Sequence, residues 1–145
     1  RSDVDLDELV NTEIARLRAL GVVVDDSGVA AARVQGDRAA LARLVRNLAD
    51  NAARHARSRM AVTVTTEHGD AIVRVDDDGP GVPAADRERV FERFTRLDEG
   101  RARGAGGAGL GLALVQAVVV AHGGAVRVVD APLGGARFEA RFPAS

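Results

Sequence analysis

Two glycine-rich segments, residues 76–81 (DDDGPG) and 104–112 (GAGGAGLGL), constrain the fold of this chain more than any other feature. The first follows an alternating apolar and polar run, so a strand is expected to end in a sharp turn that carries carboxylates. A carboxylate held on such a turn can accept a hydrogen bond from a group lying against the main chain. The second opens an apolar run with helical periodicity, and the free amides at a helix start favour an anion such as a phosphate. Together the segments predict a nucleotide site, with the base at the first turn and the phosphates at the second.

Length and composition narrow the class of protein. At 145 residues the chain is expected to form one domain that buries roughly 70% of its unfolded surface. There is no Cys, which excludes disulfides, thiolate zinc sites and cysteine nucleophiles. His55, His68 and His122 are too scattered in sequence to suggest a metal cluster. The net charge of −1 gives no basic field for nucleic acid, so no nucleic-acid partner is expected.

All 20 basic residues are Arg, a bias typical of a GC-rich genome. The absence of Lys excludes a P-loop and also a protein kinase of the serine/threonine/tyrosine type, because both need a lysine to hold phosphates. The longest apolar run, from Leu110 to Ala121, is interrupted by Gln116 and is too short to span a membrane. Since the chain starts at Arg1 without a signal-peptide pattern, we expect a soluble piece of a longer protein.

The amino-terminal third predicts one helix and two short strands before a second helix. Residues 2–20 carry apolar side chains at helical spacing after an acidic start, which predicts an amphipathic helix or the end of a helical linker. Gly21 ends this segment. Residues 22–24 and 29–34 are strand candidates, separated by a predicted turn at 25–28.

A long helix is predicted from Asp37, its amino-terminal cap, to about residue 56. Asn47, Asn51 and Arg54 lie at i, i+4 and i+7, so they form a polar stripe beside the apolar one. Asn is a poor helix former, and two of them in mid-helix indicate a site rather than a tolerated surface position.

The remaining elements follow from alternation, glycine content and helical spacing. Residues 60–67 and 71–76 alternate about a short turn, which predicts a hairpin that delivers the acidic residues into the first glycine turn. The other predicted elements are a short helix from Ala84 to about Phe94, a mobile loop or lid over 96–109, a helix over 109–121, and strands over 126–130 and 137–142.

Four segments now stand in one order: residues 47–52 (NLADNA), 77–81 (DDGPG), 91–94 (FERF) and 107–112 (GAGLGL). They resemble the N, G1, F and G2 boxes of sensor histidine kinases. The resemblance extends from residues 34–37 to residues 134–138 and so covers nearly the whole chain. Each box alone is a weak signal, whereas four in order with family-like spacing are specific.

The resemblance implies the Bergerat-type ATP-binding fold shared by gyrase-type, Hsp90-type, histidine kinase and MutL-type proteins. That fold is an α/β (α+β) two-layer sandwich, with a mixed sheet of about five strands and about three helices on one face. Residues 1–20 would be the end of the linker from a dimerisation and histidine-phosphotransfer domain, and residues 21–145 the ATP-binding catalytic domain.

The resemblance also implies roles for single residues. Asp77 would accept a hydrogen bond from the adenine amino group. Asn51 would bind magnesium through its amide oxygen, with Asn47 beside it as a second candidate; a neutral oxygen suits Mg²⁺, which takes its negative partners from the phosphates. Arg54 would lie near the phosphates, and His55 replaces an aromatic residue that stacks near the base.

The lid and the phosphate tail would be held by the later boxes. By this resemblance, Phe94 and Arg96 would position the lid, and the glycines from 107 to 111 would cradle the phosphates. Ala136 stands where the family often has Thr, which removes one hydroxyl from the base pocket. The catalytic residues implied are Asn47, Asn51 and Arg54. The cofactor-binding residues implied are these three with His55, Asp77, Gly79, Gly81, Val82, Phe94, Arg96, Gly107, Gly109, Leu110, Gly111 and Leu112.

The implied function is to bind Mg-ATP and to donate its γ-phosphate to a histidine on a separate dimerisation domain, which then serves a response regulator. Gyrase-type and Hsp90-type members carry a Glu general base at the position of Asn47, and Asn cannot take that role. No His of this chain sits in the phosphoacceptor setting of the family, so the chain is not expected to phosphorylate itself. The full-length protein is expected to be anchored in the inner membrane, with this domain monomeric in the cytoplasm.

Three alternatives stay open. The first is an ATPase or protein serine kinase of the same fold, against which Asn47 argues. The second is a dinucleotide-binding oxidoreductase, because Gly104, Gly106 and Gly109 satisfy GxGxxG and Asp130 lies about 20 residues on. That fingerprint must follow a strand, and here the charged run RLDEGRAR precedes it. The third is a degenerate nucleotide-binding interaction module that has lost turnover.

Overall fold

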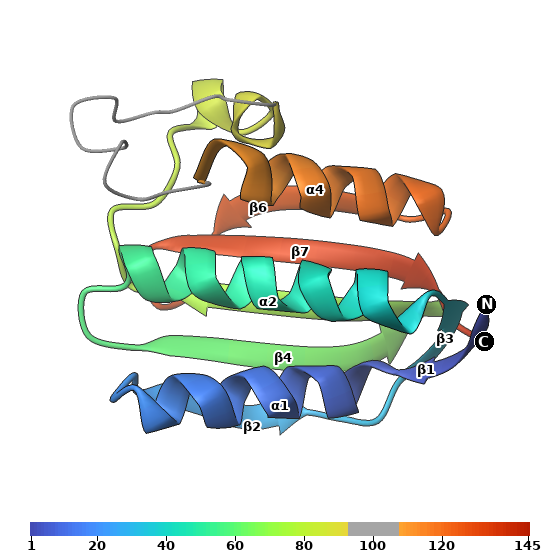
Figure 1. The fold of residues 1–145 in the computed structure, drawn as a ribbon. Helices are drawn as coiled ribbons and strands as arrows, with labels where there is room; N and C mark the ends of the chain where they lie inside the picture. The colour runs from blue at the N-terminus through green and yellow to red at the C-terminus, as the bar shows by residue number, and fades with distance from the viewer. Residues whose placement is uncertain (93–107) are drawn as a thin grey trace.

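The computed structural model describes residues 1–92 and 108–145 (Figure 1). Its centre is a five-stranded sheet in the order β2-β4-β5-β7-β6. Strands β2 and β4 are parallel, and the other neighbours are antiparallel, so the sheet is mixed as predicted. The strands are β2 (Val24–Val29), β4 (Met60–Glu67), β5 (Asp70–Asp77), β6 (Ala125–Asp130) and β7 (Ala136–Pro143).

Three α-helices in the described part of the chain cover one face of this sheet (Figure 1). They are α1 (Leu6–Ala19), α2 (Arg38–His55) and α4 (Ala108–Ala121). The core lies between the helices and the sheet, where Leu41, Leu44 and Leu48 of α2 are fully buried. The predicted two-layer sandwich is therefore confirmed. Within the described ranges, every helix is too short or too polar to cross a lipid bilayer.

Helix α2 has the bounds that the sequence predicted. The side chain of Asp37 accepts a hydrogen bond from the amide of Ala40 at 3.2 Å, which satisfies one of the unpaired donors of the first turn. The hairpin is confirmed as well: β4 and β5 pair in continuous register from Met60 opposite Asp77 to Glu67 opposite Asp70. This register brings Asp77 to the end of the sheet at which α2 also ends.

The first elements differ from the prediction. Residues Ser2–Asp5 form a strand, β1, which pairs antiparallel with β3 (Arg33–Gly36), so the predicted helix over 2–20 begins only at Leu6. The partner strand lies about 30 residues away in sequence, and Val4 is fully buried by this pairing. Helix α1 contributes to the common core. Whether residues 1–20 also lead to a phosphotransfer domain stays a prediction.

The predicted turn at 25–28 is wrong, because these residues lie inside β2. The register of β2 against β4 shifts between Asp25 and Gly28, and the carboxylate of Asp25 accepts a hydrogen bond from the amide of Ser27 at 2.9 Å. The residues that favour a turn therefore form an irregularity within a strand, with a local side-chain to backbone hydrogen bond, instead of a turn between strands. The strand predicted at 29–34 is also wrong, since residues 30–32 connect β2 to β3.

The helix predicted from Ala84 is replaced by two 3-10 turns, η1 (Ala84–Asp86) and η2 (Arg89–Phe91). Their hydrogen bonds join residues three apart, such as the amide of Asp86 to the carbonyl of Pro83 at 2.8 Å. Helix α4 begins at Ala108, one residue before the prediction. Most of the predicted lid lies outside the described residues.

Candidate functional site

The carboxylate of Asp77 is fixed at the end of β5 by two backbone amides. Asp77 is 1% exposed, and its Oδ1 accepts hydrogen bonds from the amides of Gly79 at 2.8 Å and Ala136 at 3.2 Å. Its carbonyl oxygen accepts from the amide of Gly135 at 3.1 Å. No donor to Oδ2 lies among the described residues. Backbone amides of the chain thus hold one oxygen of the carboxylate, and the other oxygen still has the capacity to accept a hydrogen bond.

Glycines pack closely around this carboxylate. A β-carbon at Gly135 would overlap Asp77 Oδ1 and would lie 2.6 Å from the amide nitrogen of Gly79. A β-carbon at Gly79 would overlap the carbonyl oxygen of His55, the last residue of α2. Gly81 has φ +77°, where a side chain is strained. The protein's own backbone therefore requires Gly79, and its predicted approach to the purine stays a prediction.

Helix α2 carries two amide side chains one turn apart, and that of Asn47 lies near the amino-terminal part of α4. Asn51 is 4% exposed, and its Oδ1 accepts a hydrogen bond from Arg54 Nη2 at 3.3 Å. Asn47 is half-buried, and a β-carbon at Gly111 would lie 3.7 Å from its Oδ1. Within the predicted polar stripe of α2, Asn47 therefore lies near Gly111 of the glycine-rich segment. This juxtaposition joins two motifs that are about 60 residues apart in sequence.

The remaining predicted residues differ in how far the structure describes them. His55 is exposed, and its Nδ1 lies 3.0 Å from the carbonyl oxygen of Asn51, so the ring folds back along α2. Val82 and Leu112 are half-buried and pack against the core. Gly109 and Leu110 lie in the first turn of α4, where only the backbone is described. Phe94, Arg96 and Gly107 lie outside the described residues.

The three acidic residues before Gly79 have different partners, and the sequence argument assigned a role only to Asp77. Asp76 binds Arg137 through two hydrogen bonds of 2.9 Å, and this pairing raises the pKa of the guanidinium. Asp78 instead accepts hydrogen bonds from the connection between α2 and β4. The alternation of β5 is the signal that could have shown the difference, because it turns Asp77 toward the helices and Asp76 toward the open face.

The backbone donors at the start of β7 were also missed. The amides of Gly135 and Ala136 bind Asp77, although only the side chain of Ala136 entered the sequence argument. The segment GGARF at 134–138 belongs to the resemblance, and its position beside the acidic turn follows from the pairing of β5 with β7.

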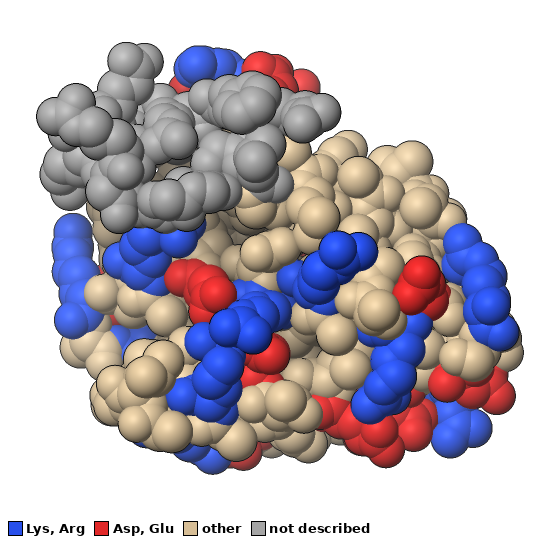
Figure 2. All heavy atoms as spheres, viewed as in Figure 1, with Lys and Arg blue, Asp and Glu red and all other residues tan. Residues whose placement is uncertain are grey.

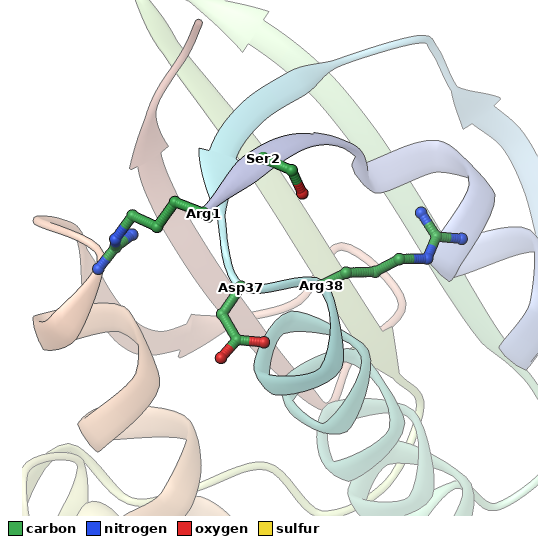
Figure 3. A pocket seen from close by; sticks show the side chains of 5 residues that line it. Arg1, Ser2, Asp37 and Arg38 are labelled. Carbon is green, nitrogen blue, oxygen red and sulfur yellow. The ribbon is translucent and has the colours of Figure 1, made fainter.

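The surface around the site is uneven in charge. Acidic and basic side chains intersperse over α1 and α2, whereas the surface over α4 is largely uncharged (Figure 2). Helix α4 has no acidic residue in its first turn and no basic residue in its last. A hollow of about 370 Å³ lined by Arg1, Ser2, Gly36, Asp37 and Arg38 lies at the amino-terminal end of α2 (Figure 3). It is at the opposite end of α2 from Asn51 and does not belong to this site.

The sheet covered by helices on one face, the buried carboxylate at the end of β5 and the two amide side chains on α2 agree with the fold that the resemblance implies. The family model described as "Histidine kinase-, DNA gyrase B-, and HSP90-like ATPase" matches residues 36–145. The chain belongs to this family.

Its curated relatives are sensor histidine kinases. Sensor protein RstB of Escherichia coli K12 is 39% identical over 147 aligned residues, which cover 98% of this chain and 34% of RstB. The histidine-protein kinase/phosphatase MprB of Mycobacterium sp. strain KMS is 45% identical over 136 residues, which cover 91% of this chain and 26% of MprB. The chain therefore spans about a third or less of the length of these relatives.

Solved structures agree with the fold. The mycobacterial sensor histidine kinase MprB superposes with a TM-score of 0.87 at 35% identity, covering 99% of this chain and 98% of that one. The ATP-binding domain of PrrB from Mycobacterium tuberculosis superposes with a TM-score of 0.82 at 28% identity, covering 99% and 97% of the two chains. The predicted fold class and family are both confirmed.

Proposed function

We propose that this chain is the ATP-binding kinase core of a two-component sensor. In this proposal it binds Mg-ATP and donates the γ-phosphate to a histidine on a separate dimerisation domain. The observation that carries the proposal is the buried carboxylate of Asp77 at the end of β5, together with two amide side chains on α2: Asn51, which is buried, and Asn47, which lies near Gly111 of α4. The names of the relatives support the same function, because they are sensor kinases.

The base would bind at Asp77. The backbone amides of Gly79 and Ala136 hold Oδ1, so Oδ2 can accept a hydrogen bond from the exocyclic amino group of adenine without disturbing the fold. Since the carboxylate is 1% exposed, a hydrogen bond to it is made in a site with little competing water. This arrangement selects a base that presents a donor.

The donor set of α2 fits a magnesium ion. Amide oxygens are suitable ligands for Mg²⁺, which usually keeps several waters and takes its anionic partners from phosphates. Asn51 would hold the ion, with Asn47 beside it; Asn51 Oδ1 accepts one hydrogen bond from Arg54 and has a second lone pair for the ion. When bound, the ion would neutralise charge on the phosphates and orient them.

The choice of acceptor follows from the residue at position 47. Asn47 presents a neutral amide rather than a carboxylate, so it cannot activate a water or a hydroxyl as a general base. A histidine brought by another domain is already a nucleophile and needs no such base. The proposed partners are therefore the phosphotransfer domain of the full-length protein and then a response regulator. In the same proposal the full-length protein is anchored in the inner membrane, and this domain lies in the cytoplasm.

Calorimetric titration with ATP tests the binding step. We expect the native chain to bind ATP more tightly with magnesium than without it, and Asn51→Ala to lose this magnesium dependence. Asn11→Ala is the matched control, because Asn11 is an exposed mid-helix Asn on α1. A native chain that does not bind ATP would overturn the proposed function. An Asn51→Ala variant with unchanged magnesium dependence would remove Asn51 from the metal site.

A further inference from the structure

The side chain of Asp78 binds the connection between α2 and β4. Its Oδ1 accepts hydrogen bonds from the amides of Arg57 at 2.8 Å, Ser58 at 3.0 Å and Arg59 at 3.3 Å. Its Oδ2 accepts from the hydroxyl of Ser58 at 2.5 Å. Three consecutive backbone amides and one hydroxyl thus converge on a single carboxylate, which lies next in sequence to Asp77.

This cluster lies where the sheet no longer holds the two segments together. The β4–β5 ladder ends at the pair of Met60 and Asp77, so residues 57–59 and Asp78 lie just beyond it. Asp78 supplies cross-strand hydrogen bonds in place of the missing ladder. The turn after Asp77 is therefore fixed to the segment that directly follows α2.

The same turn also abuts α2 itself. Gly79 lies so close to the carbonyl oxygen of His55 that a β-carbon would overlap it. Asn51 lies one turn earlier on α2, and its carbonyl oxygen contacts the ring of His55. Movement of the turn relative to the end of α2 would change the separation between Asp77 and Asn51. Those two residues are the proposed contacts for the two ends of the nucleotide.

We propose that Asp78 is a positioning residue for ATP binding, which holds the turn carrying Asp77 in register with the end of α2. This role rests on the proposed function and adds a residue that makes no contact with the ligand. Hydrogen bonds from the Ser58 hydroxyl, and then from the Ser58, Arg57 and Arg59 amides, hold the pKa of the Asp78 carboxyl far below its usual range. The carboxylate is consequently ionised near neutral pH, where charge-assisted hydrogen bonds are strong.

Two measurements on Asp78→Ala test the proposal. The first is the Kd for Mg-ATP, which we expect to rise about tenfold. The second is amide hydrogen exchange at Gly79 and Ala136, measured by NMR without nucleotide, which we expect to accelerate because both amides bind Asp77. Asp78→Asn keeps an acceptor oxygen for the backbone amides, so we expect it to restore most of the affinity and protection.

Asp25→Ala is the matched control. Asp25 also accepts a backbone hydrogen bond, from Ser27, and its pKa is lowered by it, but it lies in the edge strand β2. We expect no change of Kd or of exchange at Gly79 and Ala136 in this variant. If Asp25→Ala matches Asp78→Ala, the effect is general destabilisation and the positioning role is overturned.

The two proposals fail in different ways. A native chain that does not bind ATP overturns the proposed function. Unchanged exchange at Gly79 and Ala136 in Asp78→Ala overturns the positioning role, whether or not ATP binds. If Asp78→Ala does not fold, Ser58→Ala takes its place, because it removes only the hydroxyl donor to Asp78. Faster exchange at Gly79 and Ala136 with a rise in Kd smaller than tenfold would support the positioning role. Unchanged exchange and unchanged Kd in Ser58→Ala would contradict it.

Discussion

Two substitutions of Asp77 separate its role in stability from its role in binding. Asp77→Ala removes the acceptor of the Gly79 and Ala136 amides and leaves two buried donors unpaired. Each unpaired donor costs about 1–3 kcal/mol, so we expect the free energy of unfolding to fall by about 2–6 kcal/mol. This loss is a large part of the free energy of unfolding of a typical domain, which is roughly 5–15 kcal/mol.

Asp77→Asn has the same shape and keeps one acceptor oxygen for both amides. We expect it to cost only about 1 kcal/mol, because neutral hydrogen bonds replace charge-assisted ones. Its amide nitrogen would take the place of Oδ2 and present a donor to the donor of adenine. The variant should therefore stay folded and lose ATP binding.

Urea unfolding followed by circular dichroism measures the first effect, and calorimetric titration with Mg-ATP measures the second. Asp26→Asn is the control, since it makes the same change of charge at an exposed position on β2. Equal destabilisation by Asp77→Asn and Asp77→Ala would refute the hydrogen-bond argument. Full ATP binding by Asp77→Asn would refute the assignment of adenine to this carboxylate.

Three further substitutions test the packing and electrostatics of the domain. Gly135→Ala would drive a β-carbon into the carboxylate of Asp77, so we expect a loss of about 1–3 kcal/mol in urea unfolding together with weaker ATP binding; unchanged affinity would contradict it. Gly36→Ala would place a β-carbon 2.6 Å from His122 Cδ2, and we expect a similar loss of stability while the Kd for ATP is unchanged; a native-like unfolding curve would contradict it. Burial raises the pKa of Glu139, but hydrogen bonds from Arg74 and Arg127 outweigh this effect and lower the pKa below 4.5. The stability that Glu139 gains from the two arginines is therefore present above that pH and is lost as the pH falls through the folded-state pKa. Glu139→Gln should therefore flatten the fall of unfolding free energy below pH 4.5, and an equally steep fall would count against the argument.

The parts of the site that could be predicted from sequence are those set by local pattern. The periodicity of residues 37–56 placed Asn47 and Asn51 on one stripe of a helix, and the alternation of residues 71–76 placed Asp77 directly after a strand, which in the structure extends to Asp77 itself. The order of the four motifs then implied that these residues share a site. The structure brings Gly111 of the fourth motif near Asn47 of the first, and the shared site itself stays a prediction.

Non-local contacts explain what could not be predicted. Strand β1 depends on its pairing with residues 33–36, and its acidic residues had suggested the start of a helix instead. The partners of Asp76 and Asp78 come from β7 and from the connection after α2, so nothing in the acidic run itself distinguishes them. The two 3-10 turns over 84–91 contain charged and apolar residues at the spacing of an α-helix. Only the hydrogen bonds of the folded chain distinguish 3-10 turns from an α-helix here.

Phosphotransfer to a supplied domain tests the central claim most directly. The chain would be incubated with γ-labelled ATP and magnesium, alone and with the separately purified histidine-phosphotransfer domain of its own full-length protein. The account predicts acid-labile label on the supplied domain and none on the chain itself. A stable phosphohistidine on the chain alone, or rapid release of phosphate without any partner, would contradict it.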